Sequence, residues 1–369
     1  MKVLVIGGTG PTGPFVVNGF LEKGYDVSIL NRGSHHTDEI PASVERIIGD
    51  PHFGETLRSA LTGRSFDLIV ASYGRLRVIA EIAGDYTERL ISIGGAPGYR
   101  GTRHPETLFP EGVQVPLPED APKVNSEGEF RFGYLVKISE DAVMEGHDAK
   151  RYIATHLRYP LIYGPRQPLP CDWWLVRRLL DKRKYVVLPD GGLTVISRGY
   201  AENMANAILL AADQQETAAG KIYNCGDDQQ LTLAQWVQVI SDTMDTHLDI
   251  ISIPAKYSHP ARDMMMGSHH SHHLHYDTHL IRSELGYKDT VPVLEAFRRT
   301  VDWYLSNPPE LNKATEGNLA VQYETEDALA KIHGEMLEKL EQLGLEDVEF
   351  IHPYAHPKKP GAKEDHLGR

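Results

Sequence analysis

The chain begins with residues 1–13, MKVLVIGGTGPTG, and this stretch decides the fold. Its first seven residues are mostly β-branched or aliphatic, which predicts a strand buried on both faces. Gly7, Gly10 and Gly13 then follow with the spacing G-x-x-G-x-x-G. A strand, a glycine turn and a helix in this order leave free N–H groups at the helix N-terminus, where a dinucleotide pyrophosphate binds. We therefore expect a dinucleotide site at the start of the chain.

Strand-like and helix-like segments continue to alternate after this turn. The pattern predicts strands at 26–30, 44–48, 66–71, 89–93 and 152–158, and helices at 14–23, 55–61, 77–83 and 134–144. Such alternation favours an α/β fold, a doubly wound parallel sheet of the Rossmann type with helices on both faces. Residues 94–133 are rich in Gly and Pro and lack periodicity, which is typical of a functional loop over a site.

The sequence divides into three expected parts. Residues 1–168 form the Rossmann domain, 169–305 a smaller, discontinuous α/β substrate domain interleaved with it, and 306–369 a helical C-terminal extension. The extension is predicted from an apolar stripe at helical spacing within 324–343, formed by Leu329, Ile332, Met336, Leu340 and Leu343. We expect this stripe to pack on the body of the protein or on a partner.

The composition is that of a globular protein and excludes several classes. Hydrophobic residues make up 41% of the 369 and charged residues 24%, which argues against wholesale disorder. Asp and Glu outnumber Lys and Arg by 51 to 38, so we expect no nucleic-acid partner, because phosphate contacts need a basic face. No apolar run reaches the roughly 18 residues of a membrane span, and the opening strand is unlike a signal peptide. The only cysteines are Cys171 and Cys225, so we expect a cytoplasmic protein without a disulfide framework.

Further motifs follow in a fixed order along residues 1–305. They lie after predicted strands or before predicted helices: Gly49-Asp50, Arg158, Tyr163-Gly164-Pro165, Leu285-Gly286-Tyr287 and Trp303. Together with the glycine turn, this order resembles the extended short-chain dehydrogenase/reductases, the nucleotide-sugar epimerase/dehydratase-like group. The resemblance implies a Rossmann domain, a small substrate domain and a bound NAD(P) that carries out the redox chemistry.

The turn and the resemblance together predict the residues that contact this cofactor. They are Gly7, Thr9, Gly10, Pro11, Thr12, Gly13, Asn31, Arg32, Asp50, Ala71, Lys137 and Tyr159. By resemblance, Asp50 reaches the adenine amino group, Lys137 binds the ribose and Tyr159 flanks the nicotinamide.

The end of the second strand indicates which dinucleotide is bound. NAD enzymes usually carry an acid there for the ribose 2′-OH, whereas this chain has Asn31 followed by Arg32. A guanidinium binds a 2′-phosphate bidentately and a carboxylate repels it. We therefore expect NADP(H), with Arg32 on the 2′-phosphate. The alternative is NAD bound through Asn31, with Arg32 solvated.

The catalytic pattern of the family is broken in this chain. The family carries a Ser or Thr after the fifth strand and a Tyr four residues before a Lys on a helix, and the Tyr transfers the proton. Here Gly95 takes the Ser/Thr place if Tyr99 is the loop tyrosine, and Gly133 lies four residues before Lys137. Tyr134 lies three residues before Lys137 and still shares a helix face with it. We expect Tyr134 with Lys137 to be the proton donor and Tyr99 to be the alternate; the other interpretation is an ordinary helix tyrosine and a surface lysine.

Three functions remain open. The first is an NADP(H)-dependent oxidoreductase that acts on a small carbonyl or enone compound with atypical acid–base residues. The second is an NAD-dependent epimerase or dehydratase of a sugar-like substrate. The third is a non-catalytic NAD(P)-binding sensor. The expected partner is a small molecule in each case, and a homodimer is compatible with all three.

Two further groups of residues bear on the site. Six histidines crowd one segment: His269, His270, His272, His273, His275 and His279. A metal needs three or four converging ligands, and no Cys or Glu accompanies these imidazoles. We expect no metal there, and a loop that borders the substrate cleft. Four arginines lie in or beside loops at strand ends: Arg75, Arg77, Arg100 and Arg103. They could bind an acidic substrate, but we expect them to be solvated loop charges.

Overall fold

The computed structural model describes residues 1–34, 37–72, 74–169, 171–265, 270–310, 313–354, 356–365 and 367–369. They form two compact units, residues 1–329 and 330–369. The first unit holds a central sheet and a smaller lobe, and the second holds the end of the last helix and the residues after it.

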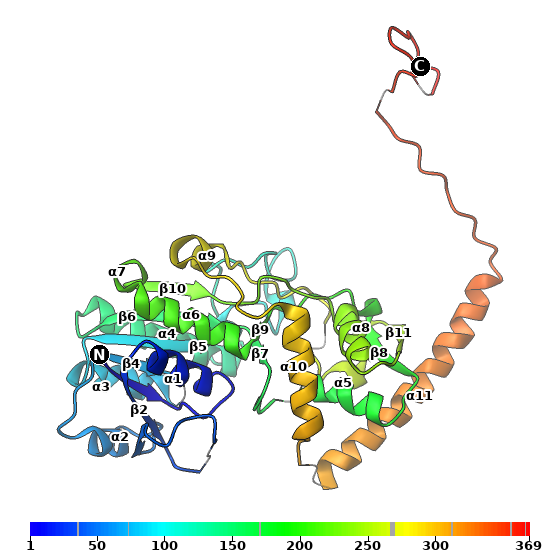
Figure 1. Ribbon diagram of the computed structural model, residues 1–369. Helices are drawn as coiled ribbons and strands as arrows, with labels where there is room; N and C mark the ends of the chain where they lie inside the picture. The colour runs from blue at the N-terminus through cyan, green and yellow to red at the C-terminus, as the bar shows by residue number, and fades with distance from the viewer. Residues whose placement is uncertain are drawn as a thin grey trace. The chain divides into compact units, whose positions relative to one another are not determined.

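Seven parallel strands make the central sheet, in the order β10-β6-β5-β4-β1-β2-β3 (Figure 1). Their bounds are β1 Lys2–Ile6, β2 Asp26–Asn31, β3 Glu45–Ile48, β4 Leu68–Ala71, β5 Arg89–Gly95, β6 Ile153–Tyr159 and β10 Lys221–Asn224. The strand order reverses at β1, which pairs with β2 on one side and β4 on the other. Such a reversal leaves a crevice at the carboxyl ends of the strands, where ligands bind. The predicted doubly wound Rossmann fold is confirmed.

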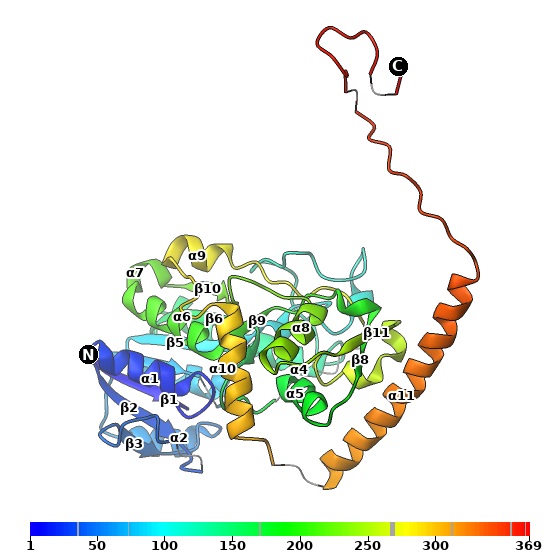
Figure 2. The ribbon, with the colours of Figure 1, turned by 45° about the vertical axis from the view of Figure 1, so that its right-hand side comes forward.

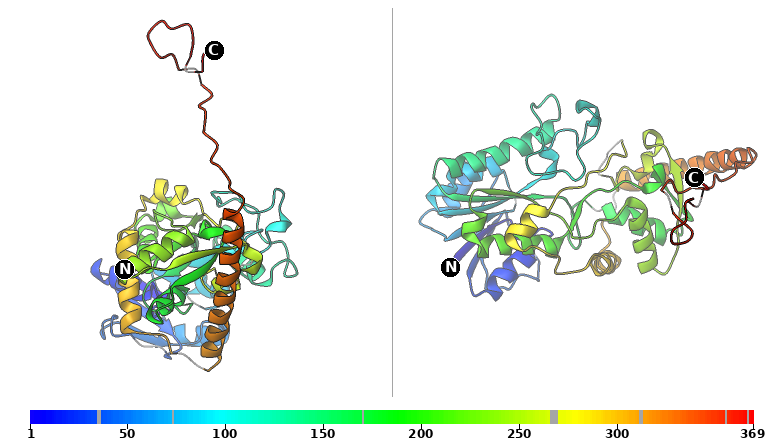
Figure 3. Two further views of the ribbon diagram at one scale, coloured as in Figure 1. Left: turned by 90° about the vertical axis from the view of Figure 1, so that its right-hand side faces the viewer. Right: turned by 90° about the horizontal axis from the view of Figure 1, so that it is seen from above.

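Helices cover both faces of this sheet, as the view from above shows (Figure 3). Helices α1 (Gly13–Glu22) and α6 (Ala201–Asp213) pack on one face, and α2 (Gly54–Leu61), α3 (Leu76–Ile82) and α4 (Arg131–Asp148) pack on the other. Side chains alternate across a strand, so Val3 and Val5 join the first core while Leu4 and Ile6 join the second. This burial on both faces is what the apolar run at the start of the chain predicts.

A smaller lobe surrounds a core of its own (Figure 2). Its two-stranded parallel sheets pair β7 (Leu161–Tyr163) with β9 (Arg198–Tyr200) and β8 (Tyr185–Pro189) with β11 (Asp249–Ile253). Helices α5 (Cys171–Leu180), α8 (Leu233–Thr243) and α10 (Val293–Ser306) pack around the same core. Two short helices, α7 (Gln215–Ala218) and α9 (His279–Leu285), add to the core on the α1 side of the central sheet.

The part of α11 (Lys313–Glu341) that belongs to the first unit is held to this lobe by a buried ion pair. Arg178 Nε lies 2.7 Å from Glu326 Oε1, and both side chains are 0% exposed. The Arg178 guanidinium also lies over the Trp174 ring, 3.5 Å from its centroid. Buried charges are costly unless they are paired and hydrogen-bonded. The pair therefore fixes where α11 meets α5.

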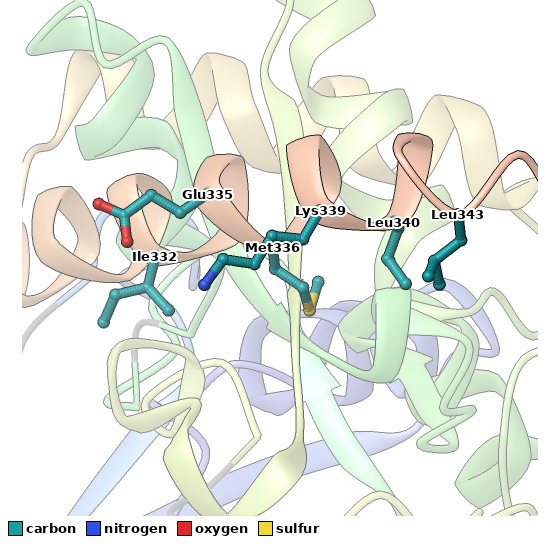
Figure 4. Close-up of a pocket in the computed structure, with 6 residues that line it drawn as sticks. All are labelled: Ile332, Glu335, Met336, Lys339, Leu340 and Leu343. Carbon is teal, nitrogen blue, oxygen red and sulfur yellow. The ribbon is translucent and has the colours of Figure 1, made fainter.

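The second unit carries four of the five residues of the predicted apolar stripe, Ile332, Met336, Leu340 and Leu343. The residues that line a groove along the end of α11 are Ile332, Glu335, Met336, Lys339, Leu340 and Leu343 (Figure 4). Within this unit the stripe is exposed, with Ile332 58% and Leu343 64% accessible. No helix in the described part of the chain is both long and apolar enough to cross a membrane.

The observed ends of the helices and strands differ from the predicted ends mainly where the hydrophobic periodicity of the sequence is weak. The predicted strands and helices of residues 1–93 are all present, with ends shifted by one or two residues. Helix α4 begins at Arg131 rather than 134, and α11 begins at Lys313 rather than 324. The segment between β5 and α4 contains short 3₁₀ turns at 96–98 and 105–107 and isolated bridges at Tyr99, Leu117 and Lys123.

Candidate functional site

The glycine turn joins β1 to α1 with the backbone that the sequence predicts. Gly7 and Gly8 have φ values of 107° and 79°, which favour glycine. A Cβ atom at Gly13 would lie 2.2 Å from the Gly8 carbonyl carbon, so the strand and the helix require glycine there. A Cβ atom at Gly10 would meet no atom within 4 Å. Open space at Gly10 beside the N-terminus of α1 fits an approaching pyrophosphate.

The rest of the turn is supported from the neighbouring strand. Thr9 and Pro11 are half-buried, and Thr12 is buried at the N-cap of α1. Asn31 Nδ2 donates to the carbonyl of Gly7 at 3.2 Å, and its Oδ1 accepts the backbone N–H two residues further on at 2.9 Å. Both ends of the Asn31 amide are therefore engaged within the protein.

The other predicted cofactor residues lie at the same edge of the sheet. Arg32 is exposed after β2, and Ala71 is buried at the end of β4. Asp50 accepts the backbone N–H of His52 at 3.0 Å and lies 2.8 Å from its Nδ1. These hydrogen bonds hold the pKa of Asp50 below its usual value, and the Arg32 guanidinium acts in the same direction. The contacts of these residues with a dinucleotide stay predictions.

A cavity of about 870 Å³ opens at the carboxyl ends of the strands. Gly94 and Gly95 of β5 and Tyr159 of β6 form part of its wall. Apolar side chains make up most of the remainder, among them Leu76, Phe130, Leu161, Ile196, Met265 and Leu274. The lining also contains one imidazole, that of His52, and two guanidinium groups, those of Arg75 and Arg103. A large apolar cavity with a few polar groups is typical of a small-molecule site.

Helix α4 gives the cavity one complete face. Phe132, Leu135, Val136 and Ser139 recur at helical spacing and all line the cavity. The pairs four residues apart on this face are Phe132 with Val136 and Leu135 with Ser139, so neither matches the Tyr–Lys pair that the resemblance implies. This face could have been recognised from the sequence, because its apolar residues follow the helical period.

Gly133 has a packing reason for being a glycine. A Cβ atom there would lie 2.4 Å from the carbonyl oxygen of Pro97, in the loop after β5. A tyrosine at this position, four residues before Lys137, would push α4 away from that loop. Gly95, in the Ser/Thr place, lines the cavity without offering a hydroxyl.

Tyr134 and Lys137 lie on another side of α4, and neither is among the described residues that line the cavity. Both are half-buried. Lys137 Nζ lies 2.6 Å from the Asp141 carboxylate, one helical turn further on. That hydrogen bond raises the pKa of Lys137. The structure does not bring this pair to the cavity, and its catalytic role stays a prediction.

Tyr99 lies in a buried polar network beneath α4. Its hydroxyl donates to Asn224 Oδ1 at 2.6 Å and accepts a hydrogen bond from the Arg158 guanidinium. Arg158 in turn donates twice to the Glu140 carboxylate of α4, at 2.6 and 2.8 Å. Burial raises the pKa of Tyr99 to about 12, against the opposing effect of Arg158. Tyr99 is 1% exposed and ties the sheet to α4; it does not appear in the described lining of the cavity.

His156 of β6 extends this network below Gly94. Its Nδ1 lies 2.7 Å from Ser92 Oγ, and its Nε2 lies 3.4 Å from the Glu140 carboxylate. A Cβ atom at Gly94 would lie 2.4 Å from that Nε2, so the imidazole requires a glycine above it. Burial lowers the pKa of His156 to about 4, which leaves the ring neutral near pH 7. Ser92, His156 and Glu140 are at most 4% exposed, so this trio is shielded from a substrate.

Two tyrosines do reach the cavity. Tyr159, the predicted nicotinamide neighbour, lines the cavity. Its hydroxyl donates to the backbone carbonyl of Met204 at 2.6 Å. Tyr276 also lines the cavity and was not singled out in the sequence. Its backbone forms a bridge with Leu117, and its N–H donates to Ser197 Oγ at 2.9 Å. No local pattern marks Tyr276, because these contacts come from segments far apart in the chain.

The histidine segment borders the same cavity through Leu274 and Tyr276. His269 lies outside the described residues. His273 Nδ1 accepts a hydrogen bond from the backbone N–H of Val195 at 3.0 Å. Burial lowers the pKa of His270 to about 4. Within the described ranges, no group of three or more His, Cys, Asp or Glu side chains could hold a metal ion.

Known proteins similar to this chain include reductases and an epimerase. No protein-family profile matches the sequence. The chain is 25% identical over 258 residues to a 3-diazoavenalumate denitrifying reductase of Streptomyces sp., across 66% of this chain and 82% of that protein. It is 28% identical over 270 residues to a 2-alkyl-3-oxoalkanoate reductase of Stenotrophomonas maltophilia, across 64% of this chain and 74% of that protein. The solved structure of UDP-glucose 4-epimerase from Thermotoga maritima has the same fold, with a TM-score of 0.65 and 18% identity, and covers 84% of this chain and 100% of that chain.

Proposed function

We propose that the chain is a member of the extended short-chain dehydrogenase/reductases and acts as an NADP(H)-dependent oxidoreductase of an apolar carbonyl or enone compound. The observation that carries the proposal is the largely apolar cavity at Gly94 and Gly95, at the carboxyl edge that also holds the glycine turn. When bound, a nicotinamide dinucleotide supplies or accepts a hydride.

The preference for NADP(H) is argued from Asn31 and Arg32. Both ends of the Asn31 amide are engaged in supporting the turn, which disfavours its use as the ribose ligand of NAD. Arg32 is exposed after β2 and close enough to Asp50 to lower its pKa. A guanidinium in this position favours a 2′-phosphate.

The substrate class is argued from the cavity wall. Its apolar side chains favour a hydrocarbon or aromatic body over a sugar, whose hydroxyls need many buried hydrogen-bonding partners. Arg75 and Arg103 add positive charge to the lining and suit a substrate with one anionic group. The two reductases similar to this chain are both named for organic acids, which supports the same class.

Sugar epimerisation is the weaker alternative because the cavity face of α4 has neither member of the Tyr–Lys pair.

An experiment distinguishes the reductase from the epimerase and from a sensor that binds the dinucleotide without oxidising it. The protein is titrated with NADPH and NADH by calorimetry, and then incubated with 4-phenyl-3-buten-2-one or with UDP-glucose. We expect tighter NADPH binding, and NADPH oxidation with the enone. Tight binding without oxidation would favour the sensor, and turnover of UDP-glucose would favour the epimerase.

A cavity variant tests whether the reaction takes place in this cavity. Leu274→Trp fills the wall formed by the histidine segment, so we expect the KM for the enone to rise by at least tenfold while NADPH binding is kept. Glu145→Trp, at an exposed position of α4, is the matched control. Equal loss in both variants would contradict the assignment of the cavity.

A further inference from the structure

The hydroxyl groups of the cavity differ in whether their protons are engaged. Four hydroxyl side chains line it: Thr102, Ser139, Tyr159 and Tyr276. The first three each donate to a backbone carbonyl, at 2.9, 2.7 and 2.6 Å respectively. The Tyr276 hydroxyl forms no hydrogen bond with any group in the described part of the chain, and its oxygen is not among the fully buried side-chain atoms that lack a partner there. The residue as a whole is 7% exposed and lines the cavity, so the hydroxyl is open to a ligand that can accept its proton.

The position of Tyr276 is set by structure on three sides. Its backbone bridges Leu117 and its N–H donates to Ser197 Oγ, which fixes the segment against both the loop after β5 and the lobe. Its ring packs beside Tyr99, with centroids 6.3 Å apart. The side chain is therefore held in place at the cavity wall before a ligand arrives, and preorganised donors are the effective ones.

The other polar groups of the lining are poorer proton donors. Arg75 and Arg103 keep their protons at any ordinary pH. His52 is already hydrogen-bonded to the Asp50 carboxylate through Nδ1. Gln167 donates through its amide to a backbone carbonyl at 2.6 Å. Tyr276 is the residue in the described lining whose hydroxyl proton is not already donated to another group of the protein.

We propose that Tyr276 is the proton donor of the proposed reductase, in the place that a helix tyrosine holds elsewhere in the family. This inference rests on the proposed function. As the carbonyl carbon gains a hydride, the C=O π pair moves to the oxygen, and that oxygen takes the proton from Tyr276 Oη. The carbonyl is reduced, the dinucleotide is oxidised, and the tyrosinate regains a proton from water. In an enone the hydride adds to the β-carbon, and the proton reaches the enolate.

The surroundings of Tyr276 fit a neutral donor. Burial raises its pKa far above that of free tyrosine, and Tyr99 adds to the effect. The phenol therefore stays protonated across the whole working range of pH. We expect turnover without a tyrosine ionisation between pH 6 and 9, unlike a Tyr whose pKa a nearby Lys has lowered.

The experiment compares the wild type with Tyr276→Phe and a matched control, Tyr304→Phe. The Tyr304 hydroxyl likewise has no hydrogen-bond partner in the described part of the chain, but it is fully buried in the lobe core, outside the described lining. The probe is 4-phenyl-3-buten-2-one labelled with ¹³C at the carbonyl. Turnover is measured with NADPH, and the carbonyl ¹³C shift is measured in the complex with NADP⁺, where no reduction takes place. We expect Tyr276→Phe to lose about 10²–10⁴-fold in turnover and to lose the downfield shift on binding, with NADPH affinity unchanged.

Each outcome separates this inference from the proposed function. An active wild type whose Tyr276→Phe variant turns over within threefold, or keeps the ¹³C shift, overturns the role of Tyr276 alone. The same holds if Tyr134→Phe shows the loss instead. A wild type that binds the probe without reducing it, and loses the shift only in Tyr276→Phe, supports the hydroxyl contact and overturns the reductase. Absence of probe binding overturns both.

Discussion

Two neighbouring side chains at the end of β2 have different tasks. Asn31 is directed inward and supports the glycine turn with both ends of its amide. Arg32 is exposed beside Asp50 and adds positive charge where the adenosine half of a dinucleotide is expected. One residue thus holds the site in shape, and the next is proposed to select its ligand.

Replacing Arg32 tests whether this residue selects NADPH over NADH. Arg32→Ala should narrow the preference for NADPH over NADH by about 1–3 kcal/mol, the size of a charge-assisted contact. Calorimetric titration of both dinucleotides measures the gap, and Arg298→Ala, at an exposed site on α10, is the control. Wild-type protein that binds NADH as tightly as NADPH would contradict the assignment.

His156 makes stability depend on pH. Its pKa is about 4 when folded, against 6.5 for a free histidine, because burial disfavours the charged ring. The unfolded chain therefore binds more protons between these values, and stability falls as pH falls. This contribution is fully present above pH 6.5 and is lost progressively toward pH 4.

His156→Gln removes the titrating group and keeps a polar side chain beside Ser92. Between pH 7 and 4.5 we expect the wild type to lose about 2–3 kcal/mol more unfolding free energy than the variant. Urea unfolding at both pH values measures it, with the exposed His247→Gln as control. Parallel losses in wild type and variant would mean that the buried ring is protonated in the folded state.

At the scale of elements, α4 and the glycine turn define the two ends of the site. The turn needs glycine at Gly13 for packing and at Gly10 for space. Helix α4 needs glycine at Gly133 to approach Pro97, and it lines the cavity with three apolar side chains and Ser139. The face of α4 toward the cavity is thus mainly an apolar wall.

The turn is tested by Gly10→Val, which fills the open space with a branched side chain. We expect dinucleotide binding to be lost, with circular dichroism and melting temperature close to wild type. Gly334→Val is the control, because a Cβ atom there also meets nothing within 4 Å. An unchanged dissociation constant in Gly10→Val would place the phosphates elsewhere.

The sequence predicted these elements unevenly, for physical reasons. In residues 1–93 the strands are short segments rich in β-branched and aliphatic residues and the helices carry apolar residues at helical spacing, so local pattern was sufficient. Strands β7 and β9 have three residues each, too few for a period, and they were missed. Tyr276 was missed because its role depends on Leu117 and Ser197, contacts that no local window contains. Tyr134 and Lys137 were singled out by their order in the family, and spacing alone could not show which side of α4 faces the cavity.

At the scale of the whole molecule, α11 is tied to the lobe by a buried ion pair before it enters the second unit. Glu326 is wholly buried against Arg178, and the Arg178 guanidinium covers the Trp174 ring. Removing one member of a buried ion pair leaves the other charge uncompensated, which is far costlier than losing a surface pair.

Glu326→Ala should therefore lower the free energy of unfolding by about 3–5 kcal/mol. Glu338→Ala, on the exposed surface of the same helix, should change it by less than about 0.5 kcal/mol. Denaturant unfolding of the full chain measures both. Similar values for the two variants would mean that α11 does not contribute to the lobe core.

The bridge between Leu117 and Tyr276 also affects the order in which the parts of the site form during synthesis. Synthesis of the glycine turn and of the first five strands is complete at residue 95, whereas the cavity wall cannot form until residue 276 has been synthesised. At roughly 5–20 residues per second on the ribosome, that interval is roughly 10–40 s. During biosynthesis the nascent chain has its dinucleotide turn long before it can enclose a substrate, so the two halves of the site mature in a fixed succession.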